Sequence, residues 1–131
     1  MVERTVRELD VITGQIISAA MKVHTRLGPG LLESTYEACL HYELVKRGLA
    51  VSAQVGLPVV YEEVKIQVGY RLDLVVNDAV IVELKAVEAI HPTHRAQLLS
   101  YLRLSNKKVG LLLNFNVRRL KDGIYRVVHR Y

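Results

Sequence analysis

Three charged residues interrupt a strongly apolar part of the chain. Asp73, Glu83 and Lys85 stand among aliphatic and β-branched residues that flank the polar pair Asn77 and Asp78. This pattern predicts a hairpin of two strands that are covered on both faces. A charged side chain is almost never fully buried without a partner, because its removal from water costs several kcal/mol. We therefore expect a bound cation or an opposite charge to compensate these side chains.

The register of this hairpin decides whether its two carboxylates can share a site. A loop of two residues would send the side chains of Asp73 and Glu83 to opposite faces. A loop of three residues, 77–79, would pair Val76 with Val80 and so bring Asp73 directly opposite Glu83. Two carboxylates that face each other repel. The three-residue loop therefore predicts a cation between them.

The carboxylates of Asp73 and Glu83, on adjacent strands, are hard oxygen ligands of the kind that Mg²⁺ prefers. Mg²⁺, or Mn²⁺ in its place, can orient a water molecule, favour its deprotonation and neutralise charge on a phosphoryl oxygen. Lys85 falls on the same face as Glu83, where it can position that water or offset negative charge in the transition state. Together these groups match the needs of phosphodiester hydrolysis.

Helices are expected on both sides of this hairpin in the sequence. Apolar residues recur every three or four positions over 6–27 and again over 31–46, which predicts two amphipathic helices. The Gly-Pro-Gly run at 28–30 separates them. A third helix is expected from Pro92, a residue that suits the first turn, with Thr93 as its cap.

The remaining apolar segments have the length and composition of strands. Segments 51–61, 64–68 and 124–131 are expected to be strands of one sheet. Segment 109–115 follows the third helix, so we expect it to run parallel to an earlier strand. The order α-α-β-β-β-α-β-β predicts an α/β sandwich with a mixed central sheet.

The composition predicts one intracellular domain. Half of the 131 residues are hydrophobic, so we expect a single domain over residues 1–131 with one core. Cys39 is the lone cysteine, which excludes an internal disulfide and a cysteine-based zinc site. The sequence has no signal peptide and no apolar run long enough to cross a bilayer, so a cytoplasmic protein is expected.

Positive charge is concentrated towards the end of the chain. Beyond residue 90, nine Lys and Arg residues stand against one acid, Asp122, so that this part carries +8 while residues 1–90 carry −3. This asymmetry suits a polyanion such as nucleic acid, although a solvated surface explains the charge equally well. The residues that we expect to contact nucleic acid are Arg95, Lys107, Lys108, Arg118, Arg119 and Lys121.

Asp73 followed by Glu83-Leu84-Lys85 resembles the core motif of the PD-(D/E)XK nuclease superfamily. Residues 69–73 resemble the G-x-x-x-D motif of its exonuclease-like branch. Further motifs agree, since residues 97–101, QLLSY, resemble the Q-x-x-x-Y helix of that branch, and residues 30–36, GLLESTY, match the signature of the GxxExxY protein family. The resemblance covers nearly the whole chain and implies a restriction-endonuclease-like three-layer sandwich.

This resemblance also implies roles for single residues. Asp73 and Glu83 would be the principal metal ligands, and the backbone carbonyl of Leu84 would be a further one. Glu33 would reach the same site from a helix as a third carboxylate. Lys85 would act as a base-like or charge-stabilising catalytic residue.

Three more residues would surround this centre. The resemblance implies that Gln97 and Tyr101 line the site from the third helix, where they would orient Lys85 or a phosphate. Tyr36 would support Glu33 by packing or by hydrogen bonding.

Three hypotheses for function follow. The first is a Mg²⁺-dependent nuclease that hydrolyses DNA or RNA, with DNA favoured. The second is a non-catalytic nucleic-acid-binding or assembly module that keeps the nuclease fold. The third is a structural ion-pair network with Lys85 between Asp73 and Glu83, although one lysine cannot balance three carboxylates. Apolar helices and an unprotected strand edge further predict a homodimer.

Overall fold

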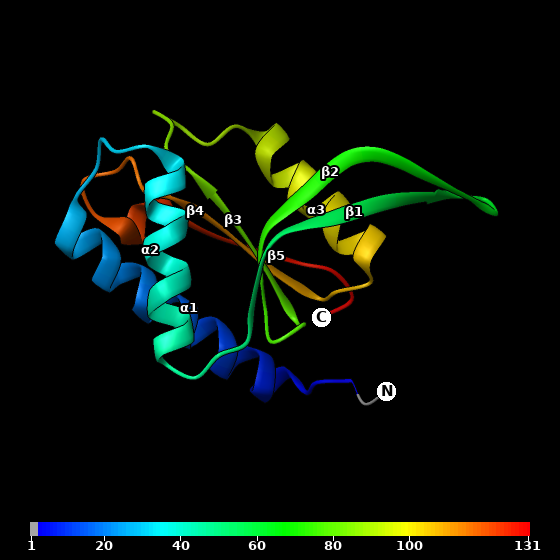
Figure 1. Ribbon diagram of the computed structural model, residues 1–131, viewed down its shortest axis with the longest axis horizontal. Helices are drawn as coiled ribbons and strands as arrows, with labels where there is room; N and C mark the ends of the chain where they lie inside the picture. Colours follow the sequence, from blue (N-terminus) through cyan, green and yellow to red (C-terminus); the bar gives the residue numbers. More distant parts are fainter. Residues whose placement is uncertain (1–2) are drawn as a thin grey trace.

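Three helices and five strands make up residues 3–131, the part of the chain that the computed structural model describes (Figure 1). Helices α1, α2 and α3 span Val6–Leu27, Glu33–Lys46 and Pro92–Ser105. The strands and one short 3₁₀ helix are β1 (Val51–Tyr61), β2 (Val64–Val76), β3 (Val80–Lys85), β4 (Val109–Asn114), η1 (Leu120–Gly123) and β5 (Ile124–Val128). The predicted order of helices and strands is confirmed. No helix in this part of the chain has the length and apolar character needed to cross a membrane.

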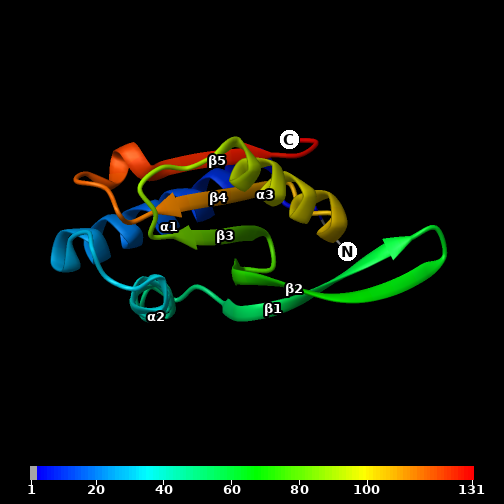
Figure 2. The same cartoon turned by 90° about the horizontal axis from the view of Figure 1, so that it is seen from above.

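The strands form one sheet in the order β1-β2-β3-β4-β5 (Figure 2). Neighbouring strands are antiparallel except β3 and β4, which run parallel. Helix α3 connects these two strands, because a parallel pair needs a long crossover connection. The mixed sheet and the parallel placement of segment 109–115 are therefore confirmed.

Helices cover the sheet on both faces. In Figure 1, α1 and α2 lie on one side of the sheet and α3 lies on the other. Val80, Val82 and Leu84 of β3 are buried with the apolar residues of α1 and α2. Ile81, between them in the sequence, is buried with Leu98 of α3. This alternation gives the three layers of a restriction-endonuclease-like fold.

Helix α1 follows the period that its sequence predicts. The hydroxyl of Thr5 caps its start by accepting a hydrogen bond from the Glu8 N–H (3.1 Å). The helix ends at Gly28, whose φ of +68° is readily adopted only by glycine. The buried apolar face consists of residues three or four apart, namely Leu9, Ile12, Ile16, Ala19, Ala20 and Val23.

The start of α2 and the cap of α3 differ from those predicted. Helix α2 starts at Glu33 instead of residue 31, because Leu32 has an extended backbone and is 73% exposed. Thr93 does not cap α3. Pro92 already occupies its first turn, so the cap is His91, the residue before it.

Strand β2 is longer than the sequence predicts. Residues 64–76 form one continuous strand, where a strand over 64–68 and a separate hairpin strand were expected. With β1 it forms a hairpin that projects beyond the rest of the sheet (Figure 2). Residues 64–71 are all exposed, although the ring of Tyr70 contacts that of Tyr101 of α3, with centroids 5.9 Å apart. The buried positions of β2 begin at Leu72.

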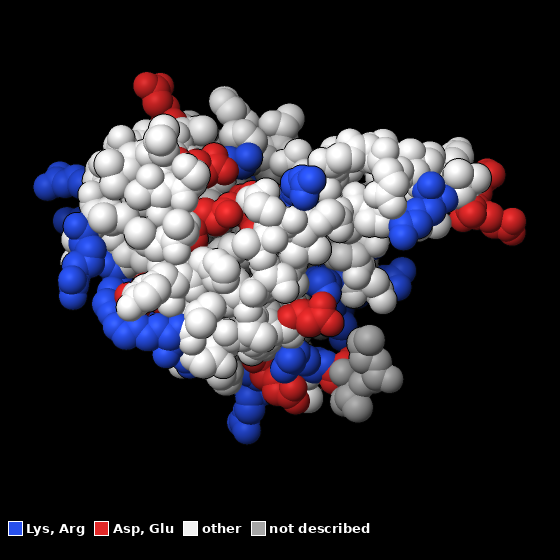
Figure 3. All heavy atoms as spheres, in the orientation of Figure 1, with Lys and Arg blue, Asp and Glu red and all other residues white. Residues whose placement is uncertain are grey.

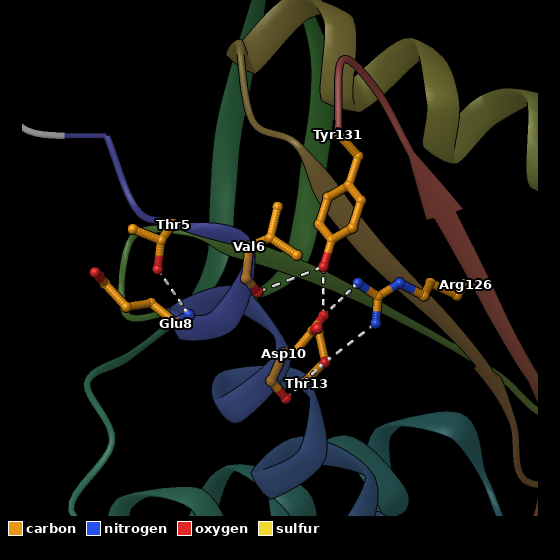
Figure 4. Close-up of polar contacts among 7 residues, drawn as sticks. All are labelled: Thr5, Val6, Glu8, Asp10, Thr13, Arg126 and Tyr131. Carbon is orange, nitrogen blue, oxygen red and sulfur yellow. Dashed lines mark hydrogen bonds and ion pairs between the residues drawn. The ribbon is translucent and has the colours of Figure 1, made fainter.

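The C-terminal end of the chain contacts α1. Strand β5 stops at Val128, three residues before the predicted end. The hydroxyl of Tyr131 donates a hydrogen bond to the carboxylate of Asp10, and Nη2 of Arg126 lies 2.9 Å from the same carboxylate (Figure 4). Nη1 of Arg126 also donates to the hydroxyl of Thr13 (3.4 Å). These contacts join β5 and the chain end to the first helix.

Candidate active site

The hairpin of β2 and β3 has the register that brings the two carboxylates together. Val76 pairs with Val80, so the loop spans residues 77–79, as the second register predicted. The first two loop residues have φ values of 52° and 51°, a region that Asn and Asp tolerate better than most residues. Continued by one step beyond the last paired residues, this register sets Asp73 opposite Glu83.

At Asp73 and Glu83, hydrogen bonds from backbone N–H groups to carboxylate oxygens replace the backbone hydrogen bonds between β2 and β3. The backbone N–H of Asp73 donates to Oε2 of Glu83 (2.7 Å), and the backbone N–H of Leu84 donates to Oδ2 of Asp73 (2.9 Å). Each strand thus presents one backbone donor to the carboxylate of the other strand. These two bonds fix both carboxylates side by side, with one oxygen of each engaged.

The electrostatics of this pair are unfavourable without a cation. Glu83 is only 7% exposed. Burial, and then the negative charge of Asp73, raise the pKa of Glu83 to about 8, despite the N–H of Asp73 and the charge of Lys85. Burial also raises the pKa of Asp73, although the hydrogen bond from the N–H of Leu84 and the charge of Lys85 lower it. A positive charge between the two carboxylates would remove this penalty.

Glu33 and Lys85 face the same pair. Partial burial of its carboxyl group, followed by the charge of Asp73, raises the pKa of Glu33, although this residue at the start of α2 is otherwise exposed. Burial is the largest influence on all three carboxyl pKa values, and Lys85 opposes it in each case. Within residues 3–131, Lys85 forms no ion pair with Glu33, Asp73 or Glu83. The structure thus brings the four predicted residues together without the close pairing that a structural ion network needs.

Tyr36 holds the segment that leads into Glu33. Its hydroxyl donates to the carbonyl oxygen of Gly28 (2.6 Å) and accepts from the N–H of Leu31 (3.1 Å). Its buried ring stacks on Phe115, with ring centroids 4.6 Å apart and planes inclined by 15°. Tyr36 therefore fixes the start of α2 through packing and backbone contacts.

The two residues predicted on α3 lie differently. Tyr101 is buried, and its pKa is raised by burial, then by the charges of Glu83, Tyr70 and Asp73. Its hydroxyl therefore lies near the carboxylate pair. Gln97 is exposed one turn earlier on α3. Within the described chain no hydrogen bond joins its side chain to the site, so its role stays a prediction.

Gln54 of β1 is a residue of this site that the sequence did not reveal. It lies opposite Asp73, between the pairs of Ala53 and Val55 with β2, and has a φ of +52°. Its amide donates to both carboxylate oxygens of Glu37 (2.9 and 3.1 Å). It also helps to lower the pKa of Asp73, although the N–H of Leu84 and the charge of Lys85 lower that pKa more strongly. Glu37 follows Glu33 by one helical turn, so Gln54 bridges α2 and β2. Helix periodicity could have pointed to Glu37, but not to Gln54.

The six basic residues predicted to contact nucleic acid differ in their surroundings. Lys107 and Lys108 each form an ion pair with an acidic side chain, at 3.0 and 3.2 Å. The guanidinium of Arg95 lies over the ring of Tyr125, 5.4 Å from its centroid. The other three, Arg118, Arg119 and Lys121, line a surface cleft of about 470 Å³, which we name the basic cleft.

The donor set at the site fits a hydrated divalent cation. Within residues 3–131, no three His, Cys, Asp or Glu side chains are arranged closely enough to hold a metal ion by themselves. Mg²⁺ is usually bound through one or two carboxylates and keeps several water ligands. Asp73 and Glu83 provide such a pair. Burial, and then the charge of Asp73, raise the pKa of Glu83, and a bound cation would oppose both effects.

A mixed sheet between helices, with two carboxylates and a lysine where β2 and β3 separate, defines a restriction-endonuclease-like protein. The family model of the PD-(D/E)XK nuclease superfamily matches residues 10–127. The chain therefore belongs to the PD-(D/E)XK nuclease superfamily. No curated protein and no solved structure matched the chain in the corresponding comparisons.

Proposed function

We propose that this protein is a Mg²⁺-dependent hydrolase of nucleic-acid phosphodiester bonds, with DNA favoured over RNA. The observation that carries the proposal is the pair of crossed carboxylates, Asp73 and Glu83, with Lys85 facing them. A purely structural site would be more stable with fewer like charges in it. Membership of a nuclease superfamily supports the same chemistry.

Asp73 and Glu83 would hold the metal, and the backbone carbonyl of Leu84 would complete the protein ligands. When bound, Mg²⁺ supplies Lewis acidity and lowers the pKa of a water ligand. Lys85 would hold the attacking water or stabilise charge that develops on the phosphate. Glu33, at the start of α2, would accept a hydrogen bond from a water molecule of the site.

The proposal includes the finer assignment to the GxxExxY protein family and to the branch with a Q-x-x-x-Y motif. Two observations support it. Glu33 of the first motif and Tyr101 of the second both lie close enough to the carboxylate pair to interact electrostatically with it. Tyr36 connects the first motif to the core.

A cleavage assay tests the proposed reaction. Labelled single-stranded and double-stranded DNA and RNA are incubated with the purified protein in Mg²⁺, Mn²⁺ or EDTA. We expect cleavage with either metal and none with EDTA. Lys85→Ala and Asp73→Asn should lower the rate by at least about 10²-fold, because each removes charge stabilisation or a metal ligand.

Lys46→Ala is the matched control, since it also removes one lysine, here an exposed one in the last turn of α2. It should cleave at the wild-type rate. Cleavage that persists in EDTA, or in both site variants, would contradict the proposal. Binding of nucleic acid without product under any metal would favour the alternative, a non-catalytic binding or assembly module, for which the basic cleft is the supporting observation.

A further inference from the structure

The basic cleft lies at the end of α1, beside the loop that follows β4. Its lining includes His24 and Gly28 from the end of α1, together with three cationic residues and no acidic one. Figure 3 shows Lys and Arg side chains gathered along the edge of the molecule where Figure 1 places the end of α1 and the loop between β4 and η1. An anionic ligand therefore meets only neutral or positive side chains there.

The three cations of the cleft are not compensated. Within residues 3–131, neither Arg118, Arg119 nor Lys121 forms an ion pair, whereas Lys107 and Lys108 do. All three side chains are exposed and lie within four positions of one another. Like charges this close repel, so a bound anion would stabilise the loop.

The backbone around these cations is held in place. Nε2 of His24 donates a hydrogen bond to the carbonyl oxygen of Val117 (2.8 Å), directly before Arg118. At the other end of the loop, Gly123 packs against the backbone of Asn114 so closely that a Cβ atom would stand 2.2 Å from its carbonyl oxygen. A preorganised loop loses less entropy when it binds a ligand.

The end of α1 contributes negative partial charge to the cleft, since helix carbonyls point outward at a C-terminus. The hydroxyl of Tyr36 reduces this effect by donating to the carbonyl oxygen of Gly28 (2.6 Å). The N–H of Gly28 bonds the carbonyl oxygen of His24 in turn (2.8 Å). Three full positive charges therefore dominate the cleft.

Strand β4, which pairs with β3 beside the candidate active site, leads directly into the loop that lines the cleft. Lys85 pairs with Asn114, and the next residue, Phe115, donates its N–H to the carbonyl oxygen of Lys85 (2.9 Å). Chain geometry and strand spacing place the backbone of Arg118 within roughly 20 Å of that of Lys85. A helical strand of nucleic acid covers that distance in about six nucleotides.

We propose that the basic cleft binds the phosphodiester backbone of the nucleic-acid strand on which the active site acts, a few nucleotides from the scissile bond. The proposal rests on the proposed function for the identity of the ligand. The planar guanidinium groups of Arg118 and Arg119 match the geometry of phosphate oxygens, and Lys121 adds a point charge. Contacts of this kind position a strand and do not read its sequence.

The test measures binding in EDTA, where no metal-dependent cleavage occurs. A short fluorescein-labelled DNA strand, longer than about six nucleotides, is titrated with protein at several salt concentrations and followed by anisotropy. We expect the double variant Arg118→Ala, Arg119→Ala to bind about tenfold more weakly. Its slope of log affinity against log salt should become shallower by about 1.4, because two phosphate contacts are lost and each contributes about 0.7 on a single strand.

Lys46→Ala, Arg47→Ala is the matched control, because it removes the same net charge from two neighbouring exposed residues at the end of α2, outside the basic cleft. It should bind nearly as well as wild type. Equal loss in both double variants, unchanged binding in the first, or no binding by the wild-type protein would overturn the proposal. Circular dichroism of each variant shows whether it is folded, and Lys121→Ala provides an independent single change in the same cleft.

The two proposals can fail separately. If the cleft variant binds weakly but the wild-type protein cleaves nothing under any metal, the cleft inference stands and the proposed reaction does not. If the wild-type protein cleaves and the cleft variant binds and cleaves normally, the reaction stands and the cleft inference is wrong.

Discussion

At the scale of single residues, Glu83 shows most clearly that the site is not built for stability. Its carboxylate is buried, faces Asp73 and has no ion-pair partner within the described chain. Its contact with the N–H of Asp73 needs only an acceptor oxygen, which a neutral amide also provides. A negative charge at this position therefore lowers the stability of the metal-free protein and is explained by a ligand that is positive.

We expect Glu83→Gln to stabilise the metal-free protein while it weakens Mg²⁺ binding. The substitution keeps an oxygen for the Asp73 N–H and removes a carboxyl group whose ionisation is opposed by burial and by the charge of Asp73. A gain of about 1 kcal/mol corresponds to a rise in the melting temperature of about 4 °C. Thermal unfolding in EDTA and calorimetric titration with Mg²⁺ check the two effects.

Glu63→Gln, an exposed acid in the turn between β1 and β2, is the control for loss of one negative charge. It should change neither quantity. If Glu83→Gln lowers the melting temperature in EDTA, the carboxylate serves the fold and the cation-site interpretation loses its main support.

Gln54 has a backbone conformation that is rare for its residue type, and its side chain explains why it is kept. Its amide connects Glu37 to the neighbourhood of Asp73. We expect Gln54→Asn to retain the fold, because Asn tolerates a φ of +52° well. The shorter side chain should lose the contact with Glu37, and Mg²⁺ affinity should fall about tenfold, as for other groups that orient metal ligands.

Calorimetric Mg²⁺ titration and the cleavage rate measure this effect, and the melting temperature reports on the fold. A lower melting temperature with unchanged Mg²⁺ affinity would mean that Gln54 is only structural. Arg71→Ala provides the control, since its guanidinium contacts the Gln54 carbonyl oxygen (3.4 Å) and no carboxylate.

At the scale of elements, the sequence predicts what local patterns determine. The period of α1 and the buried strands β3 and β4 follow from apolar spacing, and all are found. Of the two loop lengths that the sequence leaves open after Val76, the structure has three residues. The adjacency of β1, β2 and β3 also follows, because short connections keep sequential strands adjacent.

Non-local contacts account for what the sequence did not predict. The apolar residues of 64–71 do not show whether a helix covers them, so the projecting hairpin could not be anticipated. The left-handed backbone of Gln54 depends on its pairing with β2. The sequence predicted Asp73 opposite Glu83 only for the three-residue loop. The exchange of backbone bonds for carboxylate bonds at that position became visible only with both strands in place.

At the scale of the whole molecule, the candidate active site and the basic cleft both depend on contacts between the first and last thirds of the chain. Phe115, directly after β4, stacks on Tyr36 of α2, and His24 of α1 holds the loop after it. The contacts of β5 with α1 continue this connection at the other end of the helix (Figure 4). Loss of the contacts between α1 and the C-terminal end of the chain should therefore lower the stability of the whole protein.

The contact between Asp10, Arg126 and Tyr131 should make stability depend on acidic pH. The hydrogen bond from Tyr131, and then Arg126, lower the pKa of Asp10 below its ordinary value of 3.8. The folded protein therefore releases this proton more readily than the unfolded chain does. The stabilisation is complete above pH 3.8 and is lost as pH falls through the lowered pKa.

Asp10→Asn should accordingly destabilise the protein at neutral pH, and the difference from wild type should shrink in strong acid. Denaturant unfolding of both proteins across this range measures it, with Asp122→Asn as the exposed control. A difference that stays constant with pH would mean that the charge of Asp10 contributes nothing and that its contacts act as neutral hydrogen bonds.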